Sequence, residues 1–228
     1  MRYHIDTIPV WDAYKKDSEC PLCDLQAANE AAYLDNFLGA SVMEPAVRIE
    51  VNAKGFCRKH FAQMLGMQNR LGLALMTHTH LKETLAHLTA PTPAKGGLFG
   101  KKATTSDTNH PDDTCVLCER LRETMNRYCY TVLHLYKTDA EFRRVLEGGK
   151  GLCLPHYQQL SRMAGEEFGG EKGQAFQGML YELQRRNMER VEKELEWFTL
   201  KFDYRNADKP WGESKDAPER AILKLRGK

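Results

Sequence analysis

The sequence predicts an all-α protein: two tandem helical repeats, each stapled by zinc, packed as a helical bundle and followed by a C-terminal tail. Three observations lead to this prediction. Apolar residues recur at helical spacing along most of the chain, and the alternating pattern of strands is absent. Alanine and leucine, which favour helices, are frequent after the first cysteine pair. A set of cysteines and histidines occurs twice, 95 or 96 residues apart.

The composition is that of an ordinary globular protein. The chain has 228 residues, of which 42% are hydrophobic and 28% charged, with a formal net charge of +2. Collagen-like and wholly disordered chains are excluded, and the near-balance of charge gives no reason to expect nucleic acid or a membrane as the main partner. No apolar run approaches the roughly 20 residues of a membrane helix, and no secretory signal is recognisable. We therefore expect a cytoplasmic protein.

The duplication is visible in six of the seven cysteines and two of the histidines. C-P-L-C followed by C-R-K-H in the first half corresponds to C-V-L-C followed by C-L-P-H in the second. Residues between these motifs also correspond, such as Tyr33 with Tyr128. We expect a first repeat over residues 1–90, a flexible linker over 91–113, a second repeat over 114–200 and a tail over 201–228.

Each repeat is expected to contain three helices. The first follows the Cys-x-x-Cys motif, and the second starts at an acidic capping residue, Glu44 or Asp139, and ends at Gly55 or at residues 148–149. The third follows the histidine. It covers about 61–88 in the first repeat, whereas in the second a break at 165–173 precedes a long helix over about 174–200. A short helix is expected over 217–225.

Each repeat offers three thiolates and one imidazole, which is the ligand set of a closed structural zinc site. Pro21 keeps Cys20 out of the helix and places Cys23 in its first turn, where the helix N-terminus favours a thiolate. We expect two helix starts to meet on one ion within each repeat, with two Zn²⁺ per chain. The predicted ligands are Cys20, Cys23, Cys57 and His60 in the first repeat, and Cys115, Cys118, Cys153 and His156 in the second.

Two other uses of these residues stay open, an iron–sulfur cluster in each repeat and a thiol redox device. Clusters usually take cysteine alone, and a thioredoxin-like pair needs a strand–helix setting. Cys129 has no ligand counterpart, so we expect it in the core. His78, His80 and His87 raise the hypothesis of a third metal or proton site, although the second repeat has no equivalent.

The doubled cysteine–histidine pattern, closed by K-F-D-Y-R-N-A-D-K-P-W-G, resembles an uncharacterised bacterial and archaeal family known as a domain of unknown function. The resemblance covers nearly the whole chain. Members often carry the automatic label ABC transporter substrate-binding protein. We do not expect that label to apply, because exported binding proteins need a signal and typical ones have α/β lobes. The family has no assigned activity, so the resemblance supports the fold and adds little about function.

We therefore expect a zinc-binding helical protein that serves as a binding or scaffold module for a protein or small-molecule partner, rather than an enzyme. No nucleophile elbow, phosphate-binding glycine loop or H-E-x-x-H motif is present. The alternative is an iron–sulfur or thiol-redox protein. Nucleic-acid binding through the arginine-rich residues 184–193 is a weaker hypothesis, because glutamates interleave with the arginines. The aromatic residues of the tail, Phe202, Tyr204 and Trp211, are expected to pack back on the bundle.

Overall fold

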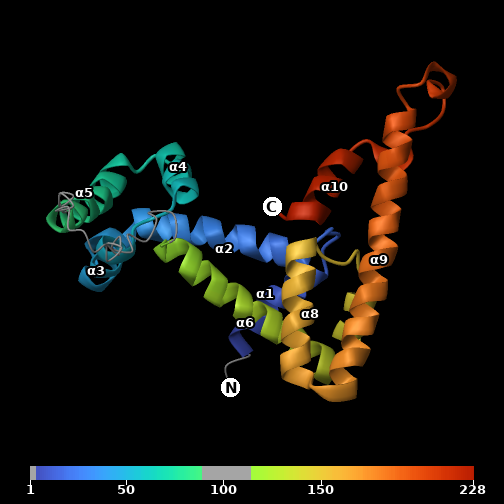
Figure 1. The fold of residues 1–228 in the computed structure, drawn as a ribbon, viewed down its shortest axis with the longest axis horizontal. Coiled ribbons are helices and arrows are strands. Elements are labelled where there is room, and N and C mark those ends of the chain that lie inside the picture. The colour runs from blue at the N-terminus through green and yellow to red at the C-terminus, as the bar shows by residue number, and fades with distance from the viewer. Residues whose placement is uncertain (1–3, 89–113) are drawn as a thin grey trace, which may run out of the picture. The chain divides into compact units, whose positions relative to one another are not determined.

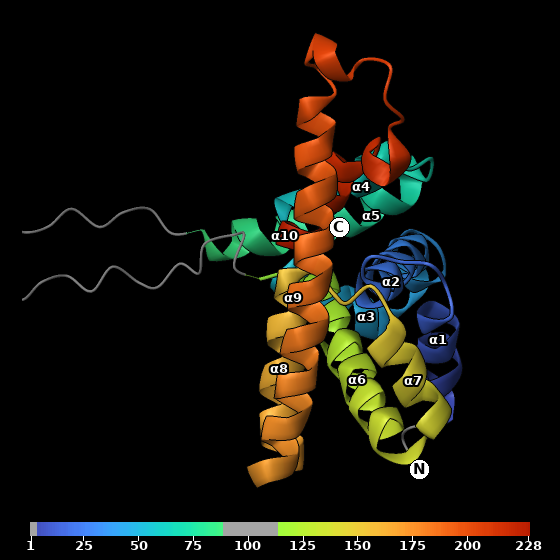
Figure 2. The same cartoon turned by 90° about the vertical axis from the view of Figure 1, so that its right-hand side faces the viewer.

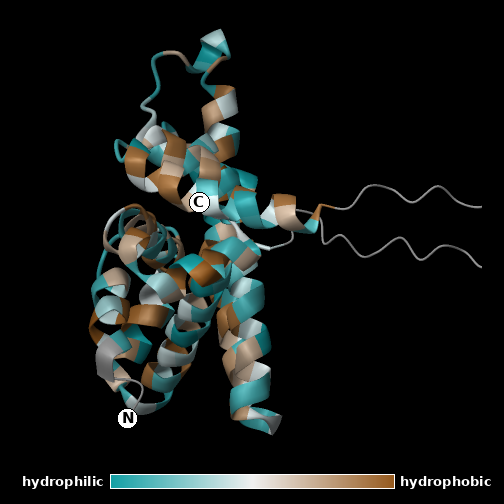
Figure 3. Cartoon of the chain, turned by 90° about the vertical axis from the view of Figure 1, so that its left-hand side faces the viewer, coloured by the Kyte–Doolittle hydropathy of each residue, from teal (hydrophilic) through white to brown (hydrophobic). Residues whose placement is uncertain are grey.

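A computed structural model describes residues 4–88 and 114–228, and these residues form α-helices and short 3-10 turns without any strand (Figure 1). The predicted all-α class is therefore confirmed. The helices carry both hydrophobic and hydrophilic residues, as expected for helices with one buried face (Figure 3). Within the described ranges, no helix has the combined length and apolar character needed to span a bilayer. The expected linker, 91–113, lies outside the described residues.

The first half of the chain contains five helices among its described residues. They are α1 (His4–Tyr14), α2 (Pro21–Leu38), α3 (Pro45–Lys54), α4 (Arg58–Gly66) and α5 (Arg70–His87), with a 3-10 turn at Ala40–Met43. The second half contains α6 (Val116–Thr138), α7 (Ala140–Gly148), α8 (Leu154–Phe168), α9 (Gly170–Leu200) and α10 (Ala217–Arg226), with 3-10 turns at Tyr204–Asn206 and Gly212–Ser214.

The short helices α3 and α7 begin and end close to the predicted residues. The Asp139 side chain accepts hydrogen bonds from the backbone N–H groups of Glu141 and Phe142 at 2.9 and 3.2 Å, which caps α7. Gly55 ends α3 with a left-handed φ of 63°, and a Cβ there would lie 2.5 Å from Nε2 of His80. Gly149 has a φ of −75°, so the left-handed stop expected after α7 is absent.

The third helix expected over 61–88 is two helices, α4 and α5. Asn69 starts α5 by accepting a hydrogen bond from the backbone N–H of Gly72 at 2.8 Å, and its amide nitrogen donates to the carbonyl of Leu38. Apolar spacing continues across the break, which is why periodicity did not reveal it. In the second half, the break expected over residues 165–173 is confirmed, but it is confined to Gly169, which lies between α8 and α9 and has a φ of 60°.

The chain divides into two compact units that are not sequential. The first unit holds the chain up to Ala28 together with Glu123–Lys228, and the second holds Asn29–Arg122. This division does not coincide with the two repeats predicted from the sequence.

Each unit has its own apolar core. In the second unit, the ring of Phe56 packs edge-to-face against Phe37 and Phe61, with centroids 5.2 and 5.5 Å apart. In the first unit, α8 and α9 lie side by side (Figure 2). The rings of Phe176 and Tyr136 pack edge-to-face, with their centroids 4.7 Å apart. Cys129 is fully buried, which confirms its predicted place in the core, and burial raises the pKa of its thiol to about 12.

The tail returns to the first unit through α10, which packs against α8 and α9. Lys224 on α10 is 0% exposed. Its ammonium donates hydrogen bonds to the carbonyl oxygens of Glu19, at 2.7 Å, and Lys150, and lies 3.1 Å from the Glu19 carboxylate. The tail aromatics fit the expected packing only in part, because Phe202 and Tyr204 are exposed while Trp211 contacts Phe198.

We expect Lys224→Ala to lower the free energy of unfolding by about 3 kcal/mol, because the substitution leaves two carbonyl acceptors without their donor and removes one cation from the buried Glu19 carboxylate. Arg190 still pairs with Glu19 at 2.7 Å, which limits the loss. Urea unfolding of the purified protein measures the effect. The exposed Lys215→Ala on the approach to α10 is the control and should change stability by less than about 0.5 kcal/mol. Equal effects of the two substitutions would contradict the anchoring role.

Candidate metal centres

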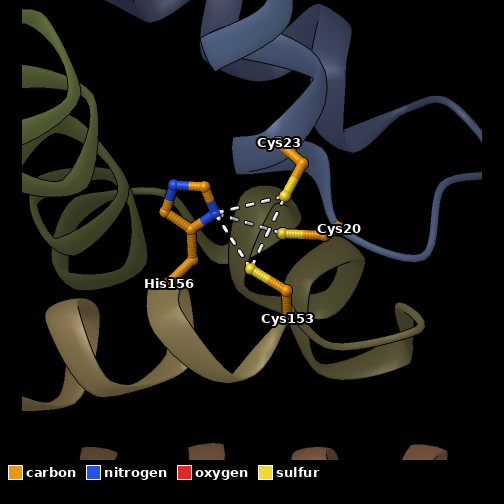
Figure 4. A group of neighbouring side chains, drawn as sticks. All are labelled: Cys20, Cys23, Cys153 and His156. Carbon is orange, nitrogen blue, oxygen red and sulfur yellow. Dashed lines mark hydrogen bonds between the residues drawn. The ribbon is translucent and has the colours of Figure 1, made fainter. Parts of the chain in front are cut away.

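Four predicted ligands from the first unit converge in one buried group, which we call site A. Cys20 and Cys23 come from the start of α2, and Cys153 and His156 come from the start of α8 (Figure 4). Nδ1 of His156 lies 3.5, 3.4 and 3.2 Å from the sulfurs of Cys20, Cys23 and Cys153. The sulfurs of Cys23 and Cys153 are 3.5 Å apart.

The other four predicted ligands lie in the second unit and form site B. Cys57 and His60 come from the start of α4, and Cys115 and Cys118 come from the start of α6. Nδ1 of His60 is 3.2, 3.3 and 3.4 Å from the sulfurs of Cys57, Cys115 and Cys118. Within each site the four ligand atoms lie within 4.8 Å of one another, so each site could hold a metal ion.

The predicted pairing of the motifs is wrong, although all eight residues are brought into the two sites. Each site takes its Cys-x-x-Cys from one predicted repeat and its Cys-x-x-His from the other. Helix lengths are consistent with the exchange. The 18 residues of α2 extend about 27 Å, whereas the 10 residues of α3 extend about 15 Å. The helix α3 alone is therefore too short to lead the chain back along the whole of α2 before Cys57 is reached.

Local backbone structure places each ligand at a helix start. Cys57 and Cys153 are the extended residues that precede α4 and α8, and the histidines follow in the first helical turn. In site B, the backbone N–H of Cys118 points to the sulfur of Cys115 at 3.4 Å. Unpaired N–H groups and the positive end of the helix dipole favour thiolates at all four helix starts.

The segment before α6 is held against the end of α3 within the second unit. The hydroxyl of Thr114 donates to the carbonyl of Lys54 at 2.8 Å, and the backbone N–H of Val116 donates to the carbonyl of Gly55 at 3.1 Å. Lys54 also forms an ion pair with Glu119. These contacts position the two halves of site B independently of any ion.

One thiol in each site is a poor acid, whereas hydrogen bonds from Cys153 and Cys20 lower the pKa of Cys23. Burial raises the pKa of Cys20 well above its ordinary value, and the sulfurs of Cys153 and Cys23 raise it further. Burial also raises the pKa of Cys118 to about 12, with Cys115 and Cys57 adding to the rise. A positive ion at the centre of each group would stabilise the thiolates, since an opposite charge nearby favours the ionised form.

Glu30 orients the histidine of site B and was not predicted. Its carboxylate accepts a hydrogen bond from Nε2 of His60 at 3.0 Å. The same carboxylate forms an ion pair with the ammonium of Lys59 at 2.6 Å. Burial lowers the pKa of His60 although Glu30 opposes the shift, so the ring is neutral and its Nδ1 is available as a ligand. No sequence signal marks Glu30, because the corresponding position of the second half is Met125.

The C-terminal end of the chain covers site A and was also not predicted. Gly227 has a φ of 81°, and a Cβ at this position would lie 3.4 Å from the sulfur of Cys23 and 3.5 Å from that of Cys153. Lys228 forms an ion pair with Asp24 in the first turn of α2. All four ligands of site A are buried, whereas Cys118 of site B is exposed and Cys57 is partly so.

The histidine cluster of α5 does not join either site. Nδ1 of His80 lies 2.9 Å from the carbonyl oxygen of Asn52, to which it donates, and Nε2 of His87 lies 3.2 Å from the Glu83 carboxylate. Among the described residues, sites A and B are the groups of potential ligands that converge. The structure therefore gives His80 a packing role beside Gly55 and does not support a third site.

We expect Glu30→Ala to lower the metal affinity of site B by about 10- to 100-fold and to leave site A unchanged, because groups that orient a ligating histidine contribute this much. Competition with a chromogenic chelator measures both affinities. Glu83→Ala, which removes an exposed carboxylate of the same unit, is the control. A loss shared equally by both ions would show that Glu30 does not act through His60.

When the chain is compared with known protein families, one family matches it. The family described as "Family of unknown function (DUF6062)" matches residues 1–228. Neither the curated proteins nor the solved structures contain a match to this chain. The match agrees with the resemblance drawn from the doubled motifs and spans the whole sequence. The chain therefore belongs to the DUF6062 family of unknown function.

Proposed function

We propose that this protein is a structural zinc protein with one Zn²⁺ in site A and one in site B, which serves as a helical scaffold for a partner. The convergence of two complete sets of three cysteines and one histidine is the observation that carries the proposal. Such sets are typical of closed structural zinc sites. The ligands are those predicted from the sequence, with the two Cys-x-x-His motifs exchanged.

The separations between ligand atoms support a single tetrahedral ion. Around zinc, with Zn–S bonds of about 2.3 Å and Zn–N bonds of about 2.0 Å, sulfurs lie about 3.8 Å apart and sulfur lies about 3.5 Å from nitrogen. The sulfurs of Cys57 and Cys118 are 3.8 Å apart, and those of Cys23 and Cys153 are 3.5 Å apart. Both histidines approach their three sulfurs at 3.2–3.5 Å.

The iron–sulfur alternative fits the ligand spacing less well. A cluster binds its ligands through separate irons, so its cysteine sulfurs spread around several metal atoms. The ligand atoms of each site lie within 4.8 Å of one another, which suits one ion. Histidine in both sets also departs from the all-cysteine ligation of most clusters.

Four protein ligands per ion favour a structural role over catalysis at the metal, because catalytic zinc keeps a position open for water or substrate. Two of the three arginines that suggested nucleic-acid binding pair with carboxylates, and Arg186 donates to the backbone carbonyl of Glu147 at 3.0 Å. Arg185 contacts Glu182 and Glu189, and Arg190 contacts Glu194 and Glu19. A scaffold held by two ions is the function that these observations support together.

Paired substitutions test the assignment of ligands to ions. We expect Cys20→Ser with Cys153→Ser to lose one Zn²⁺ per chain, because both residues belong to site A. Cys20→Ser with Cys57→Ser should lose two, because the pair removes one ligand from each site. Mass spectrometry under non-denaturing conditions, checked by elemental analysis, counts the ions.

Cys129→Ser is the matched control and should keep both ions, since Cys129 lies in neither site. If Cys20→Ser with Cys57→Ser loses one ion while Cys20→Ser with Cys153→Ser loses two, the motifs pair within each repeat after all. A wild-type protein that carries no zinc after purification without chelators would contradict the proposed function itself.

The two ions should leave the protein at different rates. We expect a chelator to remove the ion of site B first, because Cys118 is exposed while every ligand of site A is buried. Alkylation during chelation, followed by peptide mass spectrometry, should therefore label Cys118 and Cys57 before Cys20 and Cys153. Simultaneous labelling of both sites would show that exposure does not control release.

A further inference from the structure

Sites A and B have the same types of ligand but differ in how far their sulfurs are shielded from solvent. The three cysteines of site A are 0–2% exposed. A Cβ on Gly227 would lie 3.4 and 3.5 Å from two of their sulfurs, so the end of the chain closes over this site. In site B, Cys118 is exposed and Cys57 is partly exposed, whereas Cys115 is buried. A molecule in solution can therefore reach two cysteines of site B, while those of site A are covered.

The two accessible cysteines of site B are also close neighbours. The sulfurs of Cys57 and Cys118 are 3.8 Å apart, and a disulfide requires them to approach to about 2.05 Å. Cys57 is an extended residue that precedes α4, so its side chain can shift without unwinding the helix. The third sulfur, that of Cys115, is buried and accepts the backbone N–H of Cys118 at 3.4 Å. Cys57 is therefore better placed than Cys115 to form a bond with Cys118.

A bound Zn²⁺ would keep these sulfurs in the form that an oxidant attacks. A thiol that ligates a metal ion is deprotonated outright, and the thiolate is the reactive form of cysteine. Cysteines that respond to oxidants are accessible to solvent and often lie beside a second cysteine that completes a disulfide. Cys118 and Cys57 meet both conditions. The sulfurs of site A are as close to one another but are not accessible.

We propose that site B is a peroxide-sensitive switch, in which hydrogen peroxide joins Cys57 to Cys118 in a disulfide and releases the Zn²⁺. The switch requires an ion in site B and therefore rests on the proposed function. It adds to that function an oxidative modification that one of the two sites undergoes and the other does not. Site A, with the same ligand types in the same chain, is the internal control.

The oxidation consists of two displacements. The thiolate of Cys118 attacks one oxygen of hydrogen peroxide, the O–O bond breaks, and the departing hydroxide takes up a proton from solvent to form water. Cys118 is then a sulfenic acid. The thiolate of Cys57 attacks the sulfur of this sulfenic acid, a disulfide forms, and the second hydroxide also takes up a proton. The two sulfurs lose two electrons in total, one peroxide gains them and becomes two waters, and the ion loses two of its four ligands.

The disulfide would replace one link between two helix starts with another. Cys57 immediately precedes α4 and Cys118 lies in the first turn of α6, 61 residues further along the chain. The ion holds these helix starts together before oxidation, and the disulfide holds them afterwards. A thiol reductant reverses the change by exchange with the disulfide, after which added Zn²⁺ can bind again.

Treatment of the full-length, zinc-loaded protein with hydrogen peroxide tests the switch. We expect the loss of one Zn²⁺ per chain, counted by mass spectrometry under non-denaturing conditions. Peptide mapping without reduction should find one disulfide, between Cys57 and Cys118. The ion of site A should leave at least about tenfold more slowly, because its thiolates are shielded. A thiol reductant with added Zn²⁺ should restore two ions per chain.

Histidine substitutions separate the reactive thiol from metal binding. Cys118→His removes the exposed thiol but keeps four ligands, since two cysteines with two histidines also form structural zinc sites. We expect this variant to retain both ions at the peroxide concentration that empties site B of the wild type. Cys23→His makes the same exchange at the equivalent position of site A. This matched control should lose the ion of site B as fast as the wild type does. If Cys118→His does not bind zinc in site B, the disulfide map of the wild type carries the test.

Three outcomes would overturn the switch: both ions stay bound in peroxide, the two ions leave at the same rate, or zinc-loaded Cys118→His loses its ion as fast as the wild type. A disulfide between Cys115 and Cys118 would overturn the assignment of Cys57 as the second thiol. Protein that holds no zinc before peroxide is added would contradict the proposed function, so that failure is distinguished from a failure of the switch.

Discussion

The packing of three cysteine sulfurs and one histidine nitrogen around a single point is the constraint on which both units depend. Sulfurs 3.5 Å apart in a buried site cannot all be thiolates unless a cation lies between them, because unpaired charges are costly away from water. In each site the four ligands come from two helix starts. An ion that satisfies the thiolates therefore also fixes the position of one helix start relative to another.

The exchange of motifs gives the two sites different spans along the chain. Site A joins Cys23 to Cys153, which are 130 residues apart, and site B joins Cys57 to Cys118, which are 61 residues apart. Closing a longer loop costs more conformational entropy, although the cost grows only with the logarithm of its length. Site A therefore requires the beginning and the second half of the chain together, which explains why the first unit is discontinuous in sequence.

The sequence was sufficient for most helices and for the eight candidate ligands, but not for α1, for the break between α4 and α5, or for the grouping of the ligands. Repetition shows which residues are alike, whereas it does not show which of them touch. The difference in length between α2 and α3 is a physical feature that disfavours pairing Cys20 with Cys57. Glu30 and Gly227 were missed for another reason: each has a spatial role without a repeated or periodic signal, and the fold alone brings Gly227 from the other end of the chain to Cys23.

The surroundings of the two sites differ in a way that follows from charge. Three thiolates and one Zn²⁺ leave a net charge of −1, so each proposed centre is stabilised by cations near it. At site A these are Lys224 and Lys228, and the pKa of Lys228 is raised first by Asp24 and also by the sulfurs of Cys23 and Cys20. At site B, Lys59 forms an ion pair with Glu30, and Glu30 in turn accepts a hydrogen bond from the ligand His60. Site A is therefore enclosed by C-terminal residues whose cations also pair with Glu19 and Asp24, whereas site B keeps an exposed thiol. A partner or a reactive molecule in solution would meet site B first.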